Sequence, residues 1–186
     1  HSKSDLLLSV VSESVPHLKR GCLRDFQLIM GESFNDSKFN KSDFIYLFDK
    51  AKLEFFSADD PSKLRGARRD ILFLNEANNI TYDAFRELDS RTRLCCIADW
   101  NPVSDFWFHQ NNLGDDAGSY YIHATYKDAL SVIPQKVVDN ILEMGERDPN
   151  WKHIYIEGLL GKIEGLVHPY FEQVDALPKG DAFYGL

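Results

Sequence analysis

The sequence predicts an α/β fold in which a mostly parallel sheet is flanked by helices. Short apolar runs of strand length alternate with amphipathic helical segments along the 186 residues. One run, Ile71–Leu74, is apolar on both faces, as is expected of a central parallel strand. Two short aromatic runs add a β-hairpin to this pattern. A chain of this length that is 44% hydrophobic can bury one sizeable core.

The opening segment predicts a strand followed by a helix. Leu6–Val11 is an apolar run interrupted only by a serine, which favours a buried strand. Ser14 precedes Val15-Pro16, a pattern typical of a helix start, and Gly31 provides the end. Between them, apolar side chains recur at every fourth residue, namely Leu18, Cys22, Phe26 and Met30.

The middle segment predicts the hairpin, the central strand and a second helix. Residues Phe44–Phe48 and Leu53–Phe56 form the two arms of the hairpin. A polar and basic stretch, Ser57–Asp70, leads into the strand Ile71–Leu74. Thr81 is placed to cap a helix with an apolar face made by Tyr82, Phe85 and Leu88.

The last segment predicts two more strands and a helical end. Leu94–Ala98 and Tyr121–Thr125 are short apolar strands separated by a Gly/Asp/Asn loop, Asn111–Ser119. Pro134–Glu146 is a predicted helix and Asn150–Glu157 continues a helical pattern. The inward face of the first of these helices is expected to carry Val137, Val138, Ile141 and Leu142.

Composition excludes several function classes. The net charge of −8 argues against a protein that coats nucleic acid with its whole surface. Cys22, Cys95 and Cys96 lack CxxC spacing, so we expect buried thiols rather than disulfides or a zinc site. The histidines show no HExxH spacing. No apolar run approaches the roughly 20 residues of a membrane span.

Polar side chains follow two of the predicted strands. Asn75 and Glu76 come directly after Ile71–Leu74, and Asn101 lies just beyond Leu94–Ala98. Ligands of open α/β sheets collect at the carboxyl ends of the strands. At that place Glu76 could polarise a water molecule, and Asn75 could hold a water molecule on Mg²⁺. Asn101 is suited to sensing a phosphate oxygen. Taken alone, these residues fit equally well a polar strand end and a side chain tied to its own turn.

An ordered set of segments resembles the large terminase subunit of tailed phages, in particular the prophage branch of that family. No single motif is specific, but their order and spacing cover nearly the whole chain. The segments are Leu64–Gly66, Asp70–Ala77, Thr81–Arg91, Asn101–Pro102, His123–Asp128, Asp148–Trp151, Tyr155–Gly158 and Glu164–Val167.

The resemblance implies a P-loop NTPase-like motor that uses ATP and Mg²⁺ to translocate double-stranded DNA into a procapsid. Ile71–Leu74 would be the Walker B strand and Glu76 the catalytic carboxylate, with Asn75 and Asn101 at the nucleotide. Arg65 matches an arginine that acts in trans on a neighbouring subunit's nucleotide. The implied partners are the portal protein, the small terminase subunit and further copies in a ring, in the host cytoplasm at the procapsid portal.

The sequence departs from the family at two places. Asn75 stands where the family more often has an acid, which weakens the Mg²⁺ role of this position. No GxxxxGK[ST] phosphate loop (Walker A) occurs in the 186 residues. We therefore expect residues 1–160 to be an ATPase domain without its Walker A strand and loop, and 161–186 an extended linker to an absent nuclease domain. Such a sheet would expose a strand edge, and the chain alone would hydrolyse little ATP.

Two other functions stay open at this point. A non-catalytic P-loop-like interaction module would explain both Asn75 and the absent phosphate loop. Another nucleic-acid ATPase, such as a helicase, would share the chemistry of the strand ends. The basic stretch Lys63–Arg69 fits either a contact with DNA phosphates or a solvated loop.

Overall fold

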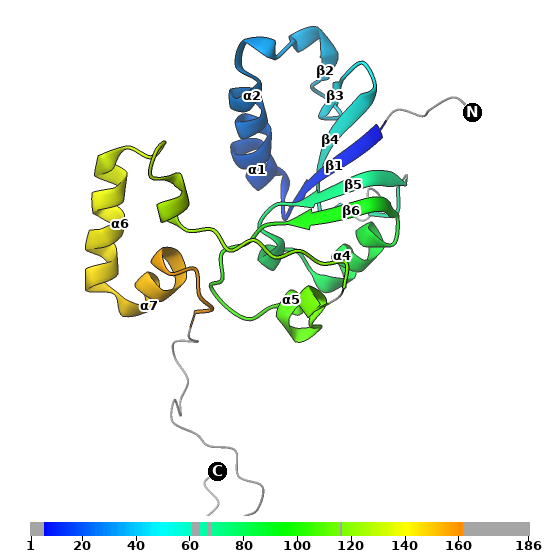
Figure 1. Cartoon of the computed structure of the whole chain (residues 1–186). Helices are drawn as coiled ribbons and strands as arrows, with labels where there is room; N and C mark the ends of the chain where they lie inside the picture. Colours follow the sequence, from blue (N-terminus) through cyan, green and yellow to red (C-terminus); the bar gives the residue numbers. More distant parts are fainter. Residues whose placement is uncertain (1–5, 61–63, 67, 116, 162–186) are drawn as a thin grey trace, which may run out of the picture.

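A computed structural model describes residues 6–60, 64–66, 68–115 and 117–161, and its centre is one six-stranded sheet (Figure 1). The strand order is β2-β3-β4-β1-β5-β6. β4, β1, β5 and β6 pair in parallel, whereas β3 pairs antiparallel with both β2 and β4. The strands are β1 Leu6–Ser12, β2 Phe39–Asn40, β3 Ile45–Leu47, β4 Ala51–Ser57, β5 Arg69–Leu74 and β6 Thr92–Ala98. The predicted fold class, including the inserted hairpin of β3 and β4, is confirmed.

Helices cover both faces of the sheet, and a further helical pair stands beside it (Figure 1). α1 and α2 lie over one face, α4 and α5 over the other, and α6 and α7 form the pair at the side. Their bounds are α1 Val15–Leu18, α2 Arg24–Met30, α4 Tyr82–Asp89, α5 Trp107–Gln110, α6 Gln135–Arg147 and α7 Pro149–Trp151. The sheet is therefore the middle layer of three.

Each face of the sheet has its own hydrophobic core. On the α1/α2 face, Val10 and Phe55 pack with Leu18 of α1. On the α4/α5 face, Leu72 and Leu74 of β5 pack with helix side chains that include Leu88, Phe106 and Trp107. Because β4, β1 and β5 contribute to both clusters and lie inside the strand order, they are the central strands.

Local signals in the sequence account for most helix ends. Thr81 accepts a hydrogen bond from the Ala84 amide, as an N-cap should. Ser14 occupies the N-cap position before α1, but its side chain makes no capping bond. Between α1 and α2, residues Lys19–Leu23 widen into a π-helical turn that the fourfold spacing did not predict. Gly31, with φ of 48°, ends α2.

Two predictions in the C-terminal half are wrong. Tyr121–Thr125 forms no strand in the described part of the chain, and its two large apolar side chains, Tyr121 and Ile122, are exposed. The segment is held by other contacts, including a bond between the His123 ring and the Gly158 carbonyl. In α6 only Val138 of the predicted inward face is buried, because the helix contacts the sheet little; Val137 and Leu142 are exposed.

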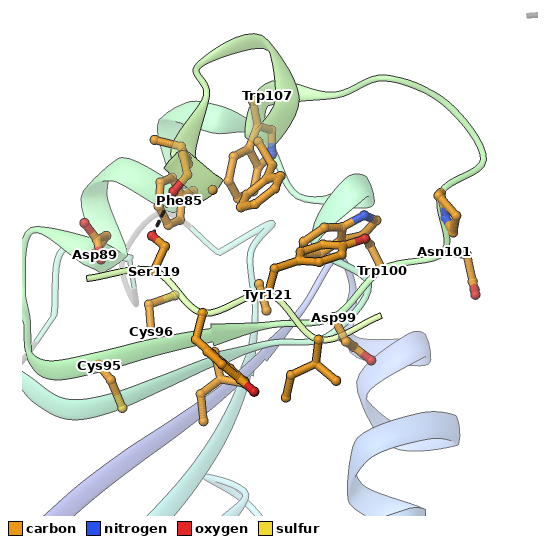
Figure 2. A pocket seen from close by; sticks show the side chains of 18 of the residues that line it. Phe85, Asp89, Cys95, Cys96, Asp99, Trp100, Asn101, Trp107, Ser119 and Tyr121 are labelled. Carbon is orange, nitrogen blue, oxygen red and sulfur yellow. Dashed lines mark hydrogen bonds between the residues drawn. The ribbon is translucent and has the colours of Figure 1, made fainter. Parts of the chain in front are cut away.

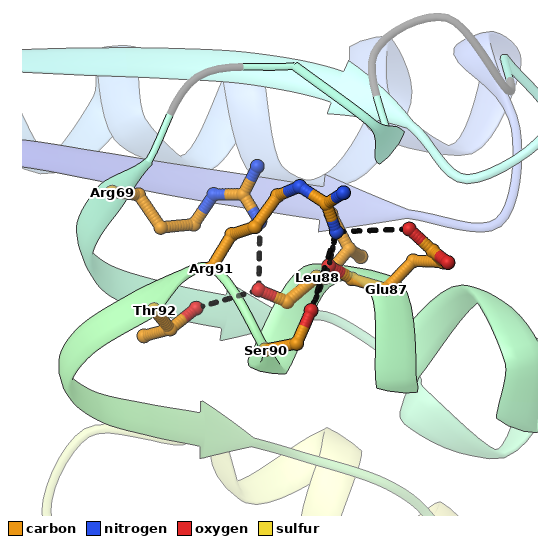
Figure 3. Close-up of polar contacts among 6 residues, drawn as sticks. All are labelled: Arg69, Glu87, Leu88, Ser90, Arg91 and Thr92. Atoms are coloured by element: carbon orange, nitrogen blue, oxygen red, sulfur yellow. Dashed lines mark hydrogen bonds and ion pairs between the residues drawn. The ribbon is translucent and has the colours of Figure 1, made fainter.

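The amino edge of the sheet is closed by an arginine network (Figure 3). Arg69, at the start of β5, is 2% exposed and donates to the Leu88 carbonyl at the end of α4 and to the Ser9 hydroxyl. Ser9 in turn donates to Glu54 of β4. Burial lowers the pKa of Arg69, while Glu54 acts in the opposite direction. Arg69 is thus a core residue and not part of a solvated basic loop.

Among the described residues, no helix has the length and apolar character needed to cross a membrane. Gly161 is still joined to the body, through its amide and the Pro102 carbonyl. The predicted linker 161–186 lies almost wholly outside the described residues, so its boundary stays a prediction.

Candidate active site

The candidate site lies where β1, β5 and β6 end. Parallel pairing aligns Leu74 with Val11 on one side and with Ala98 on the other, so the next residues meet at one edge. Asn75 continues the ladder by donating its amide to the Val11 carbonyl at 2.8 Å. The side chain of Asn75 is half-buried there. The predicted edge is therefore confirmed as a place where polar residues meet.

Glu76 leaves the sheet through an unusual backbone conformation. Its φ of 53° and ψ of 56° lie in the left-handed region, which costs a residue with a Cβ about 1–2 kcal/mol. The side chain is exposed, and its carboxylate accepts a bond from the Asn79 amide group at 3.2 Å. Strain of this kind is typical of residues that a protein holds in place for function. A solvent-facing carboxylate held by Asn79 is suited to polarise a water molecule.

Asp99 is the partner of Glu76 across the edge. Its Oδ1 accepts the Glu76 amide at 2.8 Å, and its carbonyl accepts the Ala77 amide at 2.8 Å. Partial burial raises the pKa of Asp99, and the nearby charge of Glu76 acts in the same direction. Asp99 was not among the predicted site residues, whereas Asn101, two residues further on, was. The signal was available, since Asp99 directly follows a strand parallel to the one that Asn75 follows.

The two remaining predicted residues do not join this contact. Asn101 is exposed and lies further along the loop, away from Asp99 (Figure 2). Arg65 is exposed in the connection between β4 and β5. Within the described residues, no hydrogen bond or ion pair joins Arg65 to Glu76. A role of Arg65 on a neighbouring subunit would not require one.

A cleft of about 1820 Å³ runs along β6 and is lined by Asp99, Asn101 and Arg65 as well as by the segment 118–126 (Figure 2). β6 is the last strand in the sheet order, so its outer edge pairs with no described strand. Leu94 is 56% exposed and Ile97 is 51% exposed, although they lie in a strand of apolar residues. β6 therefore presents an outer strand edge with exposed apolar side chains beside the cleft.

All three cysteines are free, and one departs from the expectation of a buried thiol. Cys22 and Cys96 are half-buried, whereas Cys95 is exposed on the edge strand. Burial raises the pKa of Cys96 to about 12, so this thiol is protonated and unreactive at neutral pH. Neither cysteine of β6 is equipped as a nucleophile by a described neighbouring base.

The edge fits part of an ATP and Mg²⁺ site. Glu76 supplies exposed carboxylate oxygens of the type that Mg²⁺ prefers, and Asn75 follows β5 beside the end of β1. Within the described residues, no group of three or more acidic, His or Cys side chains is arranged to hold a metal ion alone. A metal here would need phosphate oxygens to complete its shell, and nothing in the 186 residues has the sequence of a phosphate loop.

No protein-family model matches the sequence, and no match is found among curated proteins. Solved structures do match. The large terminase of a thermophilic bacteriophage superposes with a TM-score of 0.72 at 17% identity over 92% of this chain. The chain spans 45% of that protein. The same terminase in complex with ATP-γ-S gives a TM-score of 0.70 at 17% identity, over 92% of this chain and 44% of that one.

A second phage protein supports the same comparison. The ATPase domain of the Thermus phage P74-26 large terminase gives a TM-score of 0.52 at 15% identity, over 86% of this chain and 78% of that domain. At these identities the likeness establishes the fold. It agrees with the resemblance found in the sequence and with the position of Glu76 at the end of a central strand. The chain therefore has the fold of phage large terminase ATPase domains.

Proposed function

We propose that this chain is the ATPase part of a phage large terminase, which hydrolyses ATP to move double-stranded DNA into a procapsid. The observation that carries the proposal is the position of Glu76. It follows a buried parallel strand, is held in a strained turn and presents its carboxylate to solvent. Carboxylates at this place of the fold orient water for attack on a phosphoryl group.

The phosphates would be bound by a segment that these 186 residues do not contain. The outer edge of β6 offers unpaired backbone groups and exposed apolar side chains beside a wide cleft. A parallel strand added there would end next to Asp99 and Glu76, because parallel strands end at the same edge. Its following loop would then bring backbone amides to the nucleotide. Asn75 and Asn101 would contact the nucleotide or its metal-bound water, and Arg65 would act on a neighbouring copy.

The proposal assigns the remaining partners by resemblance. DNA, the portal protein, the small terminase subunit and a ring of copies are those of an intact large terminase. The place of action would be the host cytoplasm at the portal. A non-catalytic module is the second candidate, and the amide at position 75 favours it because an amide carries no charge to hold Mg²⁺.

The test is Mg²⁺-ATP hydrolysis by the protein extended upstream by one strand–loop–helix unit, about 30 residues. The 186-residue chain and a Glu76→Gln variant of the longer protein are measured beside it. We expect activity only in the longer wild type, with kcat lower by at least about 100-fold in the variant because the general base is lost. Glu146→Gln, an exposed glutamate on α6, is the matched control and should retain full activity.

Two results would overturn the proposal. Hydrolysis that survives Glu76→Gln would remove the assigned catalytic carboxylate. No hydrolysis by any of the proteins, with or without duplex DNA, would favour the non-catalytic module.

A further inference from the structure

The loop after β5 is tied to the end of β6 by one residue. Asp99 donates its amide to the Leu74 carbonyl at 3.1 Å, the last ladder bond between the two strands. Its carbonyl accepts from Ala77 and its carboxylate accepts from Glu76, both at 2.8 Å. Three consecutive bonds from Asp99 therefore fix the path of the chain on both sides of Glu76.

This fixation counteracts a conformational preference. An unconstrained glutamate leaves the left-handed region for an extended or right-handed conformation, which would turn its side chain to another direction. The bond from the Glu76 amide to the Asp99 carboxylate is charge-assisted and so stronger than a bond to a neutral acceptor. It is also the only one of the three that depends on a side chain. The identity of residue 99 thereby sets the direction of Glu76.

We propose that Asp99 is the positioning residue of Glu76, a role that depends on the proposed function only for its effect on catalysis. Asp99 does not itself touch reacting atoms. Its carboxylate holds the turn in which Glu76 faces the space beyond the strand ends, and Asn79 then orients the Glu76 carboxylate. Because Asp99 directly follows β6, a shift of that strand changes the direction of Glu76.

The alternative is a purely structural turn. In that case Asp99 contributes stability, and its loss lowers stability without any specific effect at Glu76. A structural role and a positioning role therefore predict different rates of hydrogen exchange at the Glu76 amide and different values of kcat. The exchange rate can be measured without any ATPase activity.

The first measurement is amide hydrogen exchange by NMR in the 186-residue chain, with Asp99→Ala, Asp99→Asn and Asp89→Ala. Asp89 lines the same cleft and has no hydrogen bond to the loop after β5 among the described residues. We expect exchange at the Glu76 amide to be at least about tenfold faster in Asp99→Ala, since a bond worth about 1.5–3 kcal/mol is lost. Asp99→Asn keeps an acceptor oxygen and should show a smaller change. Asp89→Ala should show none.

The second measurement is steady-state kinetics in the longer, hydrolytically active protein. Asp99→Ala should lower kcat by about 10–100-fold and leave KM for ATP within about threefold, because misdirection of Glu76 affects the chemical step. Asp99→Asn should recover most of kcat. An unchanged Glu76 amide in Asp99→Ala would overturn the proposal even if kcat falls. If no protein hydrolyses ATP, the exchange result alone supports or overturns the positioning of Glu76.

Discussion

The two edges of the sheet differ in how they treat charge. At the amino edge, the buried Arg69 joins β5, β1 and α4 through bonds to a hydroxyl and a carbonyl (Figure 3). At the carboxyl edge, the acids Glu76 and Asp99 follow neighbouring strands, are both exposed, and are joined by the bond from the Glu76 amide to the Asp99 carboxylate (Figure 2 shows Asp99). Both edges bring like charges near each other, since Arg91 contributes to the lowered pKa of Arg69 and Glu76 to the raised pKa of Asp99. The difference is that Arg69 is buried, whereas Glu76 is exposed.

Backbone conformation follows the same division. At the amino edge, Thr92 and Arg69 both donate to the Leu88 carbonyl in the last turn of α4. The carboxyl edge holds Glu76 in the left-handed region. Backbone strain lowers stability, and Phe44 and Asn112 share the positive φ of Glu76, so strain alone assigns no role. The proposed function gives the strain at Glu76 a reason, because it places the catalytic carboxylate at this edge.

The largest expected effect is at the amino edge. Arg69→Leu should lower the free energy of unfolding by about 3 kcal/mol, because it removes the buried donor to the Ser9 hydroxyl and to the Leu88 carbonyl and takes away the positive charge beside Glu54. Urea denaturation followed by circular dichroism measures this change. Arg68→Leu, at the exposed neighbouring position, is the matched control and should change stability by less than about 0.5 kcal/mol. Comparable losses in both variants would contradict the division between the edges.

Arg69→Lys sharpens this prediction if Arg69→Leu does not fold. A lysine keeps the positive charge but cannot reach the serine and the helix carbonyl with a planar fork of donors. We expect an intermediate loss of stability. A lysine variant as stable as the wild type would mean that charge alone, rather than the arrangement of bonds, closes this edge.

A substitution at the carboxyl edge should raise the free energy of unfolding rather than lower it. Glu76→Gly should raise the free energy of unfolding by about 0.5–1 kcal/mol, since glycine adopts a positive φ without the clash of a Cβ. The same denaturation experiment measures it. Glu76→Ala is the control: it removes the charge but keeps the Cβ, and should bring no such gain. If alanine stabilises as much as glycine, repulsion from Asp99 rather than backbone strain is the cost at this edge.

The sequence was sufficient for the fold because its strands and helices carry local signals. The apolar run Ile71–Leu74 and the cap at Thr81 lie where the structure has β5 and the start of α4. The strand predicted at Tyr121–Thr125 was wrong because a short apolar run that lines a cleft has the same sequence pattern as a paired strand. Whether such a run finds hydrogen-bonding partners depends on the rest of the chain.

The candidate site was predictable only in part, for a similar reason. Glu76 was found because it follows a strand, which is a local property. Its contact with Asp99 depends on the register of β5 and β6, which no local pattern determines. The neighbouring charges of Lys63–Arg69 predicted either a contact with DNA phosphates or a solvated loop, and neither fits Arg69, which is buried. Its donors act on β1 and α4, which are distant in sequence.

The smallest expected effect is a difference in pH dependence between the two edges. A bond from the Leu7 amide, together with Arg93, lowers the pKa of Asp70 at the amino edge. Its contribution to stability is therefore complete above the ordinary aspartate pKa and is lost as pH falls through the lowered value. Burial raises the pKa of Asp99, so stability falls as pH rises from the ordinary aspartate pKa through the raised value.

Urea titrations in steps between about pH 3 and 7 separate these contributions. Asp70→Asn should make stability less sensitive to acid at the low end of the range. Asp99→Asn should reduce the decline of stability with rising pH above the ordinary aspartate pKa. The double variant should show the sum of the two changes, because the edges lie a strand length, roughly 20 Å, apart. Slopes of the same sign for the two single variants would mean that Asp99 is stabilised as an anion. The nearby charge of Glu76 would then not lower the stability of the fold through Asp99.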